Sequence, residues 1–336
     1  MRLLFLIALL PAQKLLLDRL PVGAIDTLYL ARIRSAVSEA ELRAHVEFLA
    51  SDALRGREAG TPDEKVAAAY LIAQHRRFGS EPLLSHGYIH SFPLAPKRKE
   101  PKVKQGKKAL VSIVDTPYAW NVLACRRGVS APGEYVILSA HYDHIGTTST
   151  GAVYNGADDN GSGTAVLLEA ARLLHYLPPP KRTIVFFHTA AEEKGLLGAM
   201  RFVRDSLVKL DSIVAVINAD MLGRTDTLHA KDDLYLYAIG SERASPRLRA
   251  LQDSVNLFCC GWRFDYRYDD PKDPLRLFYR SDHYAFAKHG VPVVFYFGGL
   301  HEDYHGTGDD AEKIDFNRLR RAAVLIASLA WTLASL

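Results

Sequence analysis

The sequence predicts an α/β protein: a single domain with a mostly parallel central sheet flanked by helices on both faces, in three layers. Segments of strand length alternate with segments of helix length over most of the chain. The strand-length segments are continuously apolar, which is typical of parallel strands that helices cover on both sides. A length of 336 residues and a hydrophobic content of 48% are sufficient for one sizeable core.

The first clear helix has the sequence TPDEKVAAAYLIAQHRRFG and runs from Thr61 to Gly79. Thr61 is placed to cap its N-terminus, Pro62 suits the first helical position, and Glu64 stands where a capping box requires an acidic residue. Gly79 is a typical residue for the C-terminal end. We expect residues 38–79 to be helical and to pack onto the same domain.

Strands and helices then alternate to the C-terminus. The predicted strands are YVILSA, TIVFFHTA, IVAVINAD, LYLYAIG and VPVVFYFGG, at residues 135–140, 183–190, 213–220, 234–240 and 291–299. The predicted helices cover residues 163–176, 196–207, 246–257 and 282–289, with a last helix from about residue 317. This order of elements is typical of βαβ units and therefore of a parallel sheet.

A basic segment, KRKEPKVKQGKK at residues 97–108, lies before the first of these strands, and the net charge of the whole chain is only +4. A surface that binds nucleic acid normally spreads basic residues over a folded face with aromatic stacking partners, and this segment contains no aromatic residue. We therefore interpret the segment as a solvated loop rather than a contact for a polyanion. No nucleic-acid partner is expected.

The N-terminus, MRLLFLIALLPA, resembles a secretory signal peptide, because Arg2 precedes an apolar stretch that is too short to span a bilayer. Ala12 and Ala24 are the two candidate cleavage positions, so residues 1–24 form the predicted signal segment. The protein is then expected to be exported, to the periplasm or out of the cell. The alternative is an amphipathic first helix that continues through QKLLLDRL. No later segment has the roughly 20 unbroken apolar residues of a membrane span.

Side chains that can carry chemistry follow three predicted strands. YVILSA leads into His141, TIVFFHTA leads into Glu192 and Glu193, and IVAVINAD ends at Asp220. Because the carboxyl ends of parallel strands meet at one edge of a sheet, these side chains are expected to lie close together.

Two loops add further candidates. NGADDNGSG contains Asp158 and Asp159, and HEDYHGTGDD contains His301 and His305. Each feature has an ordinary structural explanation when it is taken alone: an aspartate pair before a helix is usually a cap, and a histidine at a strand end is usually a turn residue. Five groups of the right kind at the ends of neighbouring strands together favour a functional site.

The collected carboxylates indicate metal ions. Four carboxylates in one crevice would repel one another and raise their pKa values unless cations lay among them, and two divalent ions would supply that charge. Imidazole and carboxylate ligands without thiolate suit Zn²⁺, with Mn²⁺ or Co²⁺ as possible substitutes. Cys125, Cys259 and Cys260 do not have zinc-finger spacing and allow one intramolecular disulfide at most. Of two adjacent glutamates, one can bind metal while the other acts as the general base of a metal-assisted hydrolysis.

Five motifs, SAHYDHIG, GADDNGSG, AAEEKGLLGA, NADMLGR and YHGTGDD, stand in this order along the chain. They resemble the motifs of the co-catalytic di-zinc aminopeptidases, metallopeptidase family 28, which include bacterial leucyl-type aminopeptidases, over roughly residues 38–330. The resemblance implies a zinc-exopeptidase fold, a three-layer sandwich of the phosphorylase/hydrolase type, in one di-zinc peptidase domain over residues 25–336. The short stretch between Phe92 and Asn121 leaves no room for the inserted protease-associated domain that some relatives carry.

The resemblance also implies five ligands for two zinc ions per chain: His141 and Asp220 for one ion, Glu193 and His305 for the other, and Asp159 as the bridge between them. Lining up the glycines of GADDNGSG with the family pattern makes Asp159 the bridging residue. Asp158 would then be a neighbour in the loop.

The family pattern assigns further roles around these ligands. Glu192 would be the general base, which takes a proton from the metal-bridging water and passes it to the leaving amine. Asp143 would accept the second ring N–H of His141 and so fix its tautomer. Tyr304 would steady the oxyanion of the tetrahedral intermediate, and Arg280 would lie on the substrate side.

Other polar residues compete for these roles. His144 is expected to support the site rather than to bind metal, and His188 is expected to be a satisfied histidine of the core. Asp282 and His283 either brace a short helix or help to line the substrate site, and both alternatives stay open. His301 is a candidate for the rim only.

The expected protein is thus a zinc-dependent aminopeptidase whose partners are peptide substrates with a free N-terminus. One alternative is a glutaminyl-peptide cyclase, but such enzymes tend to carry a tryptophan before the last histidine ligand, where this chain has Tyr304. The other is a catalytically inactive, peptidase-like binding module. That alternative predicts lost ligands, whereas all five ligand positions are filled here.

Overall fold

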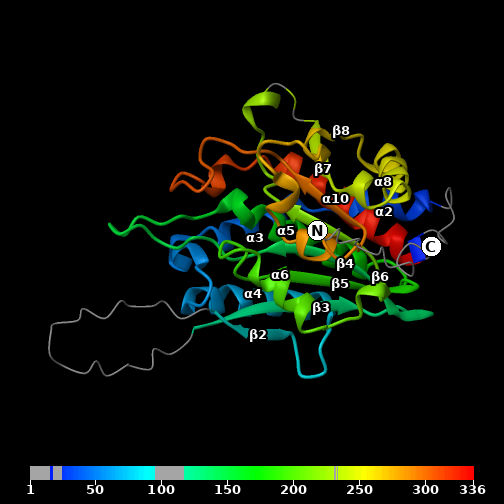
Figure 1. Ribbon diagram of the computed structural model, residues 1–336, viewed down its shortest axis with the longest axis horizontal. Coiled ribbons are helices and arrows are strands. Elements are labelled where there is room, and N and C mark those ends of the chain that lie inside the picture. Colours follow the sequence, from blue (N-terminus) through cyan, green and yellow to red (C-terminus); the bar gives the residue numbers. More distant parts are fainter. Residues whose placement is uncertain (1–15, 18–24, 95–116, 231, 233) are drawn as a thin grey trace, which may run out of the picture.

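The computed structural model describes most of the chain, namely residues 16–17, 25–94, 117–230, 232 and 234–336 (Figure 1). The predicted solvated loop at residues 97–108 lies outside the described residues, as does most of the predicted signal segment. Leu17 is described and is buried against the core. Cleavage after Ala24 would remove this contact, whereas cleavage after Ala12 would keep it. Export and the cleavage position stay predictions.

A sheet of nine strands runs through the described part of the chain (Figure 1). Its strands are β1 (Glu81–Pro82), β2 (Ile89–Pro93), β3 (Tyr118–Arg126), β4 (Ala131–His141), β5 (Arg182–Thr189), β6 (Ile213–Asp220), β7 (Tyr235–Ile239), β8 (Arg263–Asp265) and β9 (Val293–Phe297). They lie in the order β1-β3-β5-β4-β6-β9-β7-β8, with β2 paired to β3. The central strands β5, β4, β6 and β9 are parallel, while β3 and β7 run antiparallel to their inner neighbours. The prediction of a mostly parallel central sheet is confirmed.

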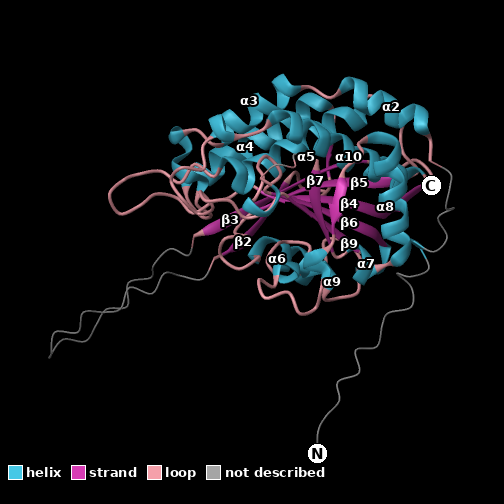
Figure 2. Ribbon diagram, turned by 90° about the horizontal axis from the view of Figure 1, so that it is seen from above, coloured by secondary structure: helices cyan, strands magenta, loops and turns pink. Residues whose placement is uncertain are grey.

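Helices cover both faces of this sheet, as predicted (Figure 2). They are α2 (Thr27–Ala36), α3 (Glu39–Leu49), α4 (Pro62–Phe78), α5 (Gly163–His175), α6 (Leu197–Arg204), α7 (Ser241–Ala244), α8 (Pro246–Cys259), α9 (Tyr284–Ala287) and α10 (Phe316–Ser335). Helices α2, α3, α4, α5 and α10 lie on one face, and α6, α7 and α9 lie on the other. Among the described helices, none combines the length and the apolar character that crossing a bilayer requires.

The central strands are apolar without interruption because both of their faces are buried. In β4, Val136 and Leu138 belong to the same buried cluster as residues of α5 and α10. Ile137, which lies between them, belongs to the opposite cluster with Phe202 of α6 and Phe286 of α9. Successive side chains of a strand point to opposite faces, so a strand covered on both sides needs apolar residues at every position.

The helix predicted from Thr61 to Gly79 is α4, and its caps are as expected. Oγ1 of Thr61 accepts the N–H of Glu64 (3.3 Å), and Gly79 has a φ of 86° in the left-handed region. The carboxylate of Glu64 accepts the N–H of Gly60 (3.0 Å), one residue before the cap. The helix predicted at residues 282–289 is shorter than expected, since only its middle, α9, is helical.

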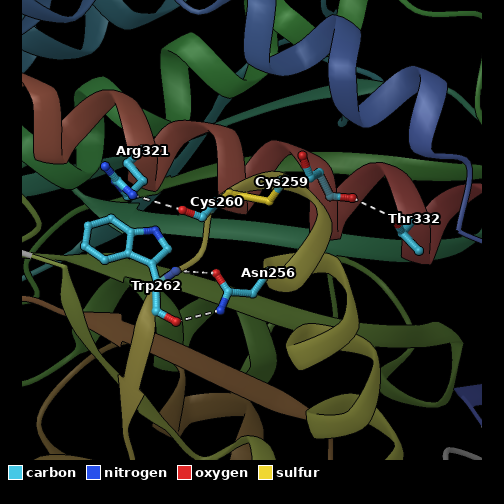
Figure 3. The surroundings of a disulfide bond; sticks show 7 residues. Asn256, Cys259, Cys260, Trp262, Arg321 and Thr332 are labelled. Carbon is cyan, nitrogen blue, oxygen red and sulfur yellow. Dashed lines mark hydrogen bonds between the residues drawn. A yellow bond between two sulfur atoms is a disulfide. The ribbon is translucent and has the colours of Figure 1, made fainter.

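Cys259 and Cys260 form a disulfide bond between adjacent residues at the C-terminal end of α8 (Figure 3). Arg321 of α10 donates a hydrogen bond to the carbonyl of Cys260 (3.0 Å). Asn256 exchanges two hydrogen bonds of 2.8 Å with the backbone of Trp262. This bond is the one intramolecular pair that the cysteine count allows, because the remaining cysteine of β3 is a buried free thiol.

Candidate metal centre

The strand ends meet as the sequence predicts. Strand β4 ends at His141, and its neighbour β6 ends at Asp220. On the other side of β4, β5 ends at Thr189, and the following turn carries the glutamate pair. One pocket at this edge of the sheet is lined by His141, Asp159, Glu192, Glu193, Asp220 and His305.

His141, Asp159 and Asp220 form the first ligand group. Nε2 of His141 lies 3.3 Å from Oδ1 of Asp159 and 3.3 Å from Oδ1 of Asp220. All three side chains are buried, and each offers a ligand atom within 4.8 Å of the other two. The other oxygen of Asp220 accepts a hydrogen bond from Oγ of Ser281 (2.7 Å). These atoms are close enough together to surround one metal ion.

Asp159, Glu193 and His305 form the second ligand group. Oδ2 of Asp159 lies 3.2 Å from Nε2 of His305, and the same nitrogen lies 3.2 Å from Oε2 of Glu193. Asp159 therefore turns one carboxylate oxygen toward each group. This is the arrangement that a carboxylate shared by two metal ions requires.

His144 lies beside the second ligand group. Its Nδ1 is 3.0 Å from Oε1 of Glu193 and 3.9 Å from Oδ2 of Asp159, so these three side chains also offer a set of close ligand atoms. The ring of His144 is fully buried behind Glu193, whereas His305 lines the pocket. The position of His144 fits support of Glu193, and that of His305 fits direct contact with a metal.

The negative charges of the pocket's carboxylates favour the binding of cations. Burial lowers the pKa of His141, but the carboxylates of Asp220 and Glu192 outweigh it and raise the pKa well above its usual value. Hydrogen bonds to Asp159 and Glu193 raise the pKa of His305 to about 10. Metal ions at these nitrogens would replace the protons that the carboxylates otherwise hold there. Imidazole with carboxylate oxygen is a donor set that fits Zn²⁺.

Glu192 lies in the same pocket, and one of its carboxylate oxygens also lies within 4.8 Å of ligand atoms of His141 and Glu193, although it belongs to neither ligand group described above. Burial raises its pKa well above the usual value, and the negative charges of Asp282 and Asp220 add to the shift. A carboxylate whose pKa is raised is a stronger base than an ordinary carboxylate. Its position and its pKa therefore suit a general base.

The predicted contact between the carboxylate of Asp143 and His141 is wrong. Nδ1 of His141 lies 3.1 Å from the backbone carbonyl oxygen of Asp143, because the chain turns directly after β4 and brings that carbonyl within reach of the ring. The carboxylate of Asp143 instead accepts the backbone N–H of Glu192 (3.1 Å). Asp143 thus orients the imidazole through its backbone and holds the glutamate turn through its side chain.

The outer part of the pocket combines two polar side chains with an apolar wall. Nη2 of Arg280 donates a hydrogen bond to the phenol oxygen of Tyr304 (3.1 Å). Burial raises the pKa of Tyr304, and the charge of Asp159 adds to the shift, so the phenol keeps its proton. The apolar wall consists of Met221, Leu277, Phe295, Phe297 and Leu300.

Three other predictions concern histidines away from the ligand groups. His188 is buried in the core, as predicted, and its Nε2 lies 2.8 Å from Nε2 of His75, but its Nδ1 has no hydrogen-bond partner among the described residues, so the histidine is only partly satisfied. His283 is also fully buried, stacks on Phe295 and directly precedes α9. His301 is not at the rim, because it is buried with its Nε2 3.2 Å from a carboxylate oxygen of Asp158.

The position of Asp282 favours a role in bracing the short helix over a role in lining the substrate site. Its carboxylate accepts a hydrogen bond from Thr189 at the end of β5, and the side chain is fully buried. Burial raises its pKa to about 6. Asp282 therefore ties the start of the short helix to the sheet and lies beneath the pocket.

Two residues beneath the ligands received no role from the sequence, although Asp309 stands within the motif YHGTGDD. Asp309 accepts the backbone N–H groups of Asp158 and Asp159, both at 3.0 Å. Arg57 is a fully buried guanidinium whose hydrogen bonds go to backbone carbonyls. An aspartate in a glycine-rich turn and an arginine in a loop are ordinary surface residues in a sequence, so only the folded chain reveals these two positions.

Comparison with known proteins places this site in a family. Residues 121–330 match the sequence profile of peptidase family M28. A probable zinc metalloprotease of Pyrenophora tritici-repentis is 31% identical over 250 residues, which cover 64% of this chain and 56% of that protein. A probable leucine aminopeptidase of Arthroderma benhamiae is 24% identical over 286 residues, which cover 81% of this chain and 74% of that protein. The chain thus spans about half the length of several curated relatives that it matches.

Solved structures share the fold. The aminopeptidase from Aneurinibacillus sp. strain AM-1 superposes with a TM-score of 0.68 at 17% identity, covering 91% of this chain and 96% of that one. The glutaminyl cyclase of Porphyromonas gingivalis superposes with a TM-score of 0.62 at 21% identity, covering 87% of this chain and 98% of that one. The matched profile extends over more than half of the chain and includes every member of both ligand groups. The chain therefore belongs to peptidase family M28.

Proposed function

We propose that this protein is a zinc-dependent aminopeptidase, which hydrolyses the N-terminal residue from peptides with a free α-amino group. The observation that carries the proposal is the position of Asp159, whose two oxygens lie 3.3 Å from His141 and 3.2 Å from His305 in one pocket with Glu192. Relatives named as a probable zinc metalloprotease and a probable leucine aminopeptidase support it.

Two Zn²⁺ ions per chain would be held by the two ligand groups: His141 and Asp220 on one ion, Glu193 and His305 on the other, and Asp159 on both. When bound, the ions would polarise the scissile carbonyl group and lower the pKa of water. Mn²⁺ and Co²⁺ are possible substitutes, since the same nitrogen and oxygen donors bind them.

The protein's own side chains would handle the protons and the developing charge. Glu192 takes a proton from the attacking water and returns it to the leaving amine. Asp143 keeps Glu192 in place by accepting its backbone N–H (3.1 Å). The phenol of Tyr304 donates to the oxyanion, and Arg280, which donates to that phenol (3.1 Å), strengthens the donor. The carboxylates of the pocket suit a free α-amino group, and this favours an exopeptidase.

An assay with two substrates tests this proposal. The purified protein is incubated with an aminoacyl chromogenic substrate and, separately, with a glutaminyl peptide, each with and without a chelator. We expect hydrolysis of the aminoacyl substrate, which the chelator abolishes and Zn²⁺ restores. Cyclisation of the glutaminyl peptide without hydrolysis would support the cyclase alternative, although Tyr304 stands where cyclases tend to carry tryptophan. Zinc binding without either activity would support an inactive binding module.

We also propose that the protein is exported, on the basis of the apolar segment that follows Arg2. N-terminal sequencing of the mature protein from cell fractions tests this. A processed N-terminus in the periplasm or medium is expected, and an intact Met1 on cytoplasmic protein would refute it.

A further inference from the structure

Arg57 is a buried cation directly beneath the two ligand groups. It lies at the end of the loop that follows α3, and its side chain is fully buried. Nε donates to the carbonyl of Tyr142 (2.7 Å), and Nη2 donates to that of Gly156 (3.0 Å). Nη1 donates to the carbonyls of Leu49 (2.5 Å) and Asn155 (2.6 Å). One guanidinium therefore joins three separate segments of backbone.

Two of these segments carry the proposed ligands. Tyr142 directly follows His141, and Gly156 stands three residues before Asp159. The loop of Arg57 also contacts both segments through its backbone: a Cβ atom at Gly56 would lie 2.2 Å from the carbonyl oxygen of Gly146 and 2.6 Å from that of Tyr154. Only glycine allows this approach, which brings the guanidinium to the carbonyls.

The backbone of the loop is bent in an unusual way to place this side chain. Arg55, Gly56 and Arg57 all have positive φ angles, of 42°, 70° and 47°. Residues other than glycine rarely adopt this conformation, and it persists where surrounding contacts impose it. Four hydrogen bonds from one buried side chain are contacts of that kind.

The positive charge of Arg57 also interacts with carboxylates of the metal centre. No carboxylate lies within ion-pair distance of it in the described structure, but Asp143, Asp159, Asp309 and Glu193 are near enough to stabilise the guanidinium. Burial lowers the pKa of Arg57 to about 10 and these carboxylates oppose the shift, so the group is charged at neutral pH. A permanent cation thus stands beneath carboxylates that would otherwise repel one another when no metal is bound.

We propose that Arg57 is a positioning residue of the metal centre: it holds the backbone after His141 and before Asp159, so that the ligands already face one another before metal binds. The proposal rests on the proposed zinc-dependent function, because it concerns the affinity of the same ligands for Zn²⁺. It goes beyond that function in assigning part of the affinity to a side chain that touches neither metal nor substrate.

Replacing Arg57 by lysine tests the proposal, because Arg57→Lys keeps the positive charge but cannot reach carbonyls in three segments. The matched control is Arg55→Lys, two residues earlier, where the side chain is 63% exposed and its guanidinium pairs with Asp63 (2.8 Å). Metal-free proteins are titrated with Zn²⁺ against a chromophoric chelator, and the absorption spectra of the Co²⁺ forms are compared. Thermal unfolding of each metal-free protein is measured alongside.

We expect Arg57→Lys to weaken Zn²⁺ binding by about 10–100-fold and to change the Co²⁺ spectrum, as loss of a group that orients metal ligands does. Arg55→Lys should match the wild type. A residue with a purely structural role would lower the unfolding temperature of the metal-free protein and leave the Zn²⁺ affinity of the folded molecules unchanged, and that result would overturn the proposal.

Two further outcomes are also informative. If Arg57→Lys folds only with metal, the rate at which chelator removes Zn²⁺ replaces the titration, and a rate equal to the wild type's would overturn the proposal. A variant that fails to fold even with Zn²⁺ would assign Arg57 to the fold and would overturn it as well. Failure of the proposed function is distinguishable, because the wild-type protein itself would then bind no Zn²⁺, or would bind Zn²⁺ without hydrolysing the aminoacyl substrate, and neither result depends on the Arg57 variant.

Discussion

Replacing Ser281 by alanine tests how the first ligand group is held. Oγ of Ser281 donates to Oδ2 of Asp220 (2.7 Å) and accepts from Nδ2 of Asn218 (2.8 Å), whose Oδ1 accepts from Ser139 (2.6 Å). All four side chains are buried. This chain of hydrogen bonds fixes the carboxylate whose other oxygen lies 3.3 Å from His141.

Two independent estimates of the free energy lost in Ser281→Ala agree. A hydrogen bond to a charged group contributes about 1.5–3 kcal/mol. Loss of a partner that orients a metal ligand typically weakens binding by about 10–100-fold, which corresponds to about 1.4–2.8 kcal/mol. We therefore expect Ser281→Ala to weaken Zn²⁺ binding at the first ligand group by about 10–100-fold and to leave binding at the second unchanged.

The two sites are separated by titrating metal-free protein with Zn²⁺ against a chromophoric chelator. Ser139→Ala, at the far end of the same chain of hydrogen bonds, is the matched control, because it leaves the bond between Ser281 and Asp220 in place. Unchanged affinities in Ser281→Ala, or an equal loss at both sites, would refute the reasoning.

Three further predictions concern the ligands and the base. Glu192→Gln should abolish turnover while metal analysis still finds two ions per chain, and surviving activity would rule out Glu192 as the base. Asp159→Ala should lose both metal ions. Asp158→Ala should keep both, because the carboxylate of Asp158 accepts the backbone N–H of Gly223 (2.6 Å). The opposite result would make Asp158 the bridging ligand. In metal-free protein the pKa of His305 is raised from 6.5 to about 10, so its stabilisation is complete below pH 6.5 and is lost as the pH rises through 10. The melting temperature of the metal-free protein should therefore fall between pH 7 and 10. That of the zinc-loaded protein, in which His305 is a neutral ligand, should not show this fall. A melting temperature of the metal-free protein that stays constant over this pH range would contradict the prediction.

The centre of the fold could be predicted because burial leaves a direct mark on the sequence. Strands β4, β5 and β6 are covered on both faces, so each is a continuous apolar run that ends where a functional side chain begins. Strands β1 and β8, of two and three residues, are too short to show any pattern. Strand β3 has Asn121 within an apolar stretch, and its antiparallel place beside β5 depends on pairing that no local pattern specifies.

The positions of the ligand side chains could be predicted from the motifs and the strand ends, but the network beneath them could not. The contact of His141 with a backbone carbonyl instead of a carboxylate depends on how the chain turns after β4. Ser281 reaches Asp220 from a segment 61 residues further along the chain. Contacts of this length arise from the packing of complete elements, and a single sequence carries no trace of them.

The spread of the ligands along the chain, from His141 at the end of β4 to His305 after β9, has a consequence for when the metal enters. Strand β9 lies between β6 and β7, so the sheet closes only after nearly the whole chain is available. The second ligand group lacks His305 until that moment, and a chain that ends before residue 305 could assemble only the first. A metal ion can therefore bind the complete second ligand group only after β9 has joined the sheet and brought His305 into place.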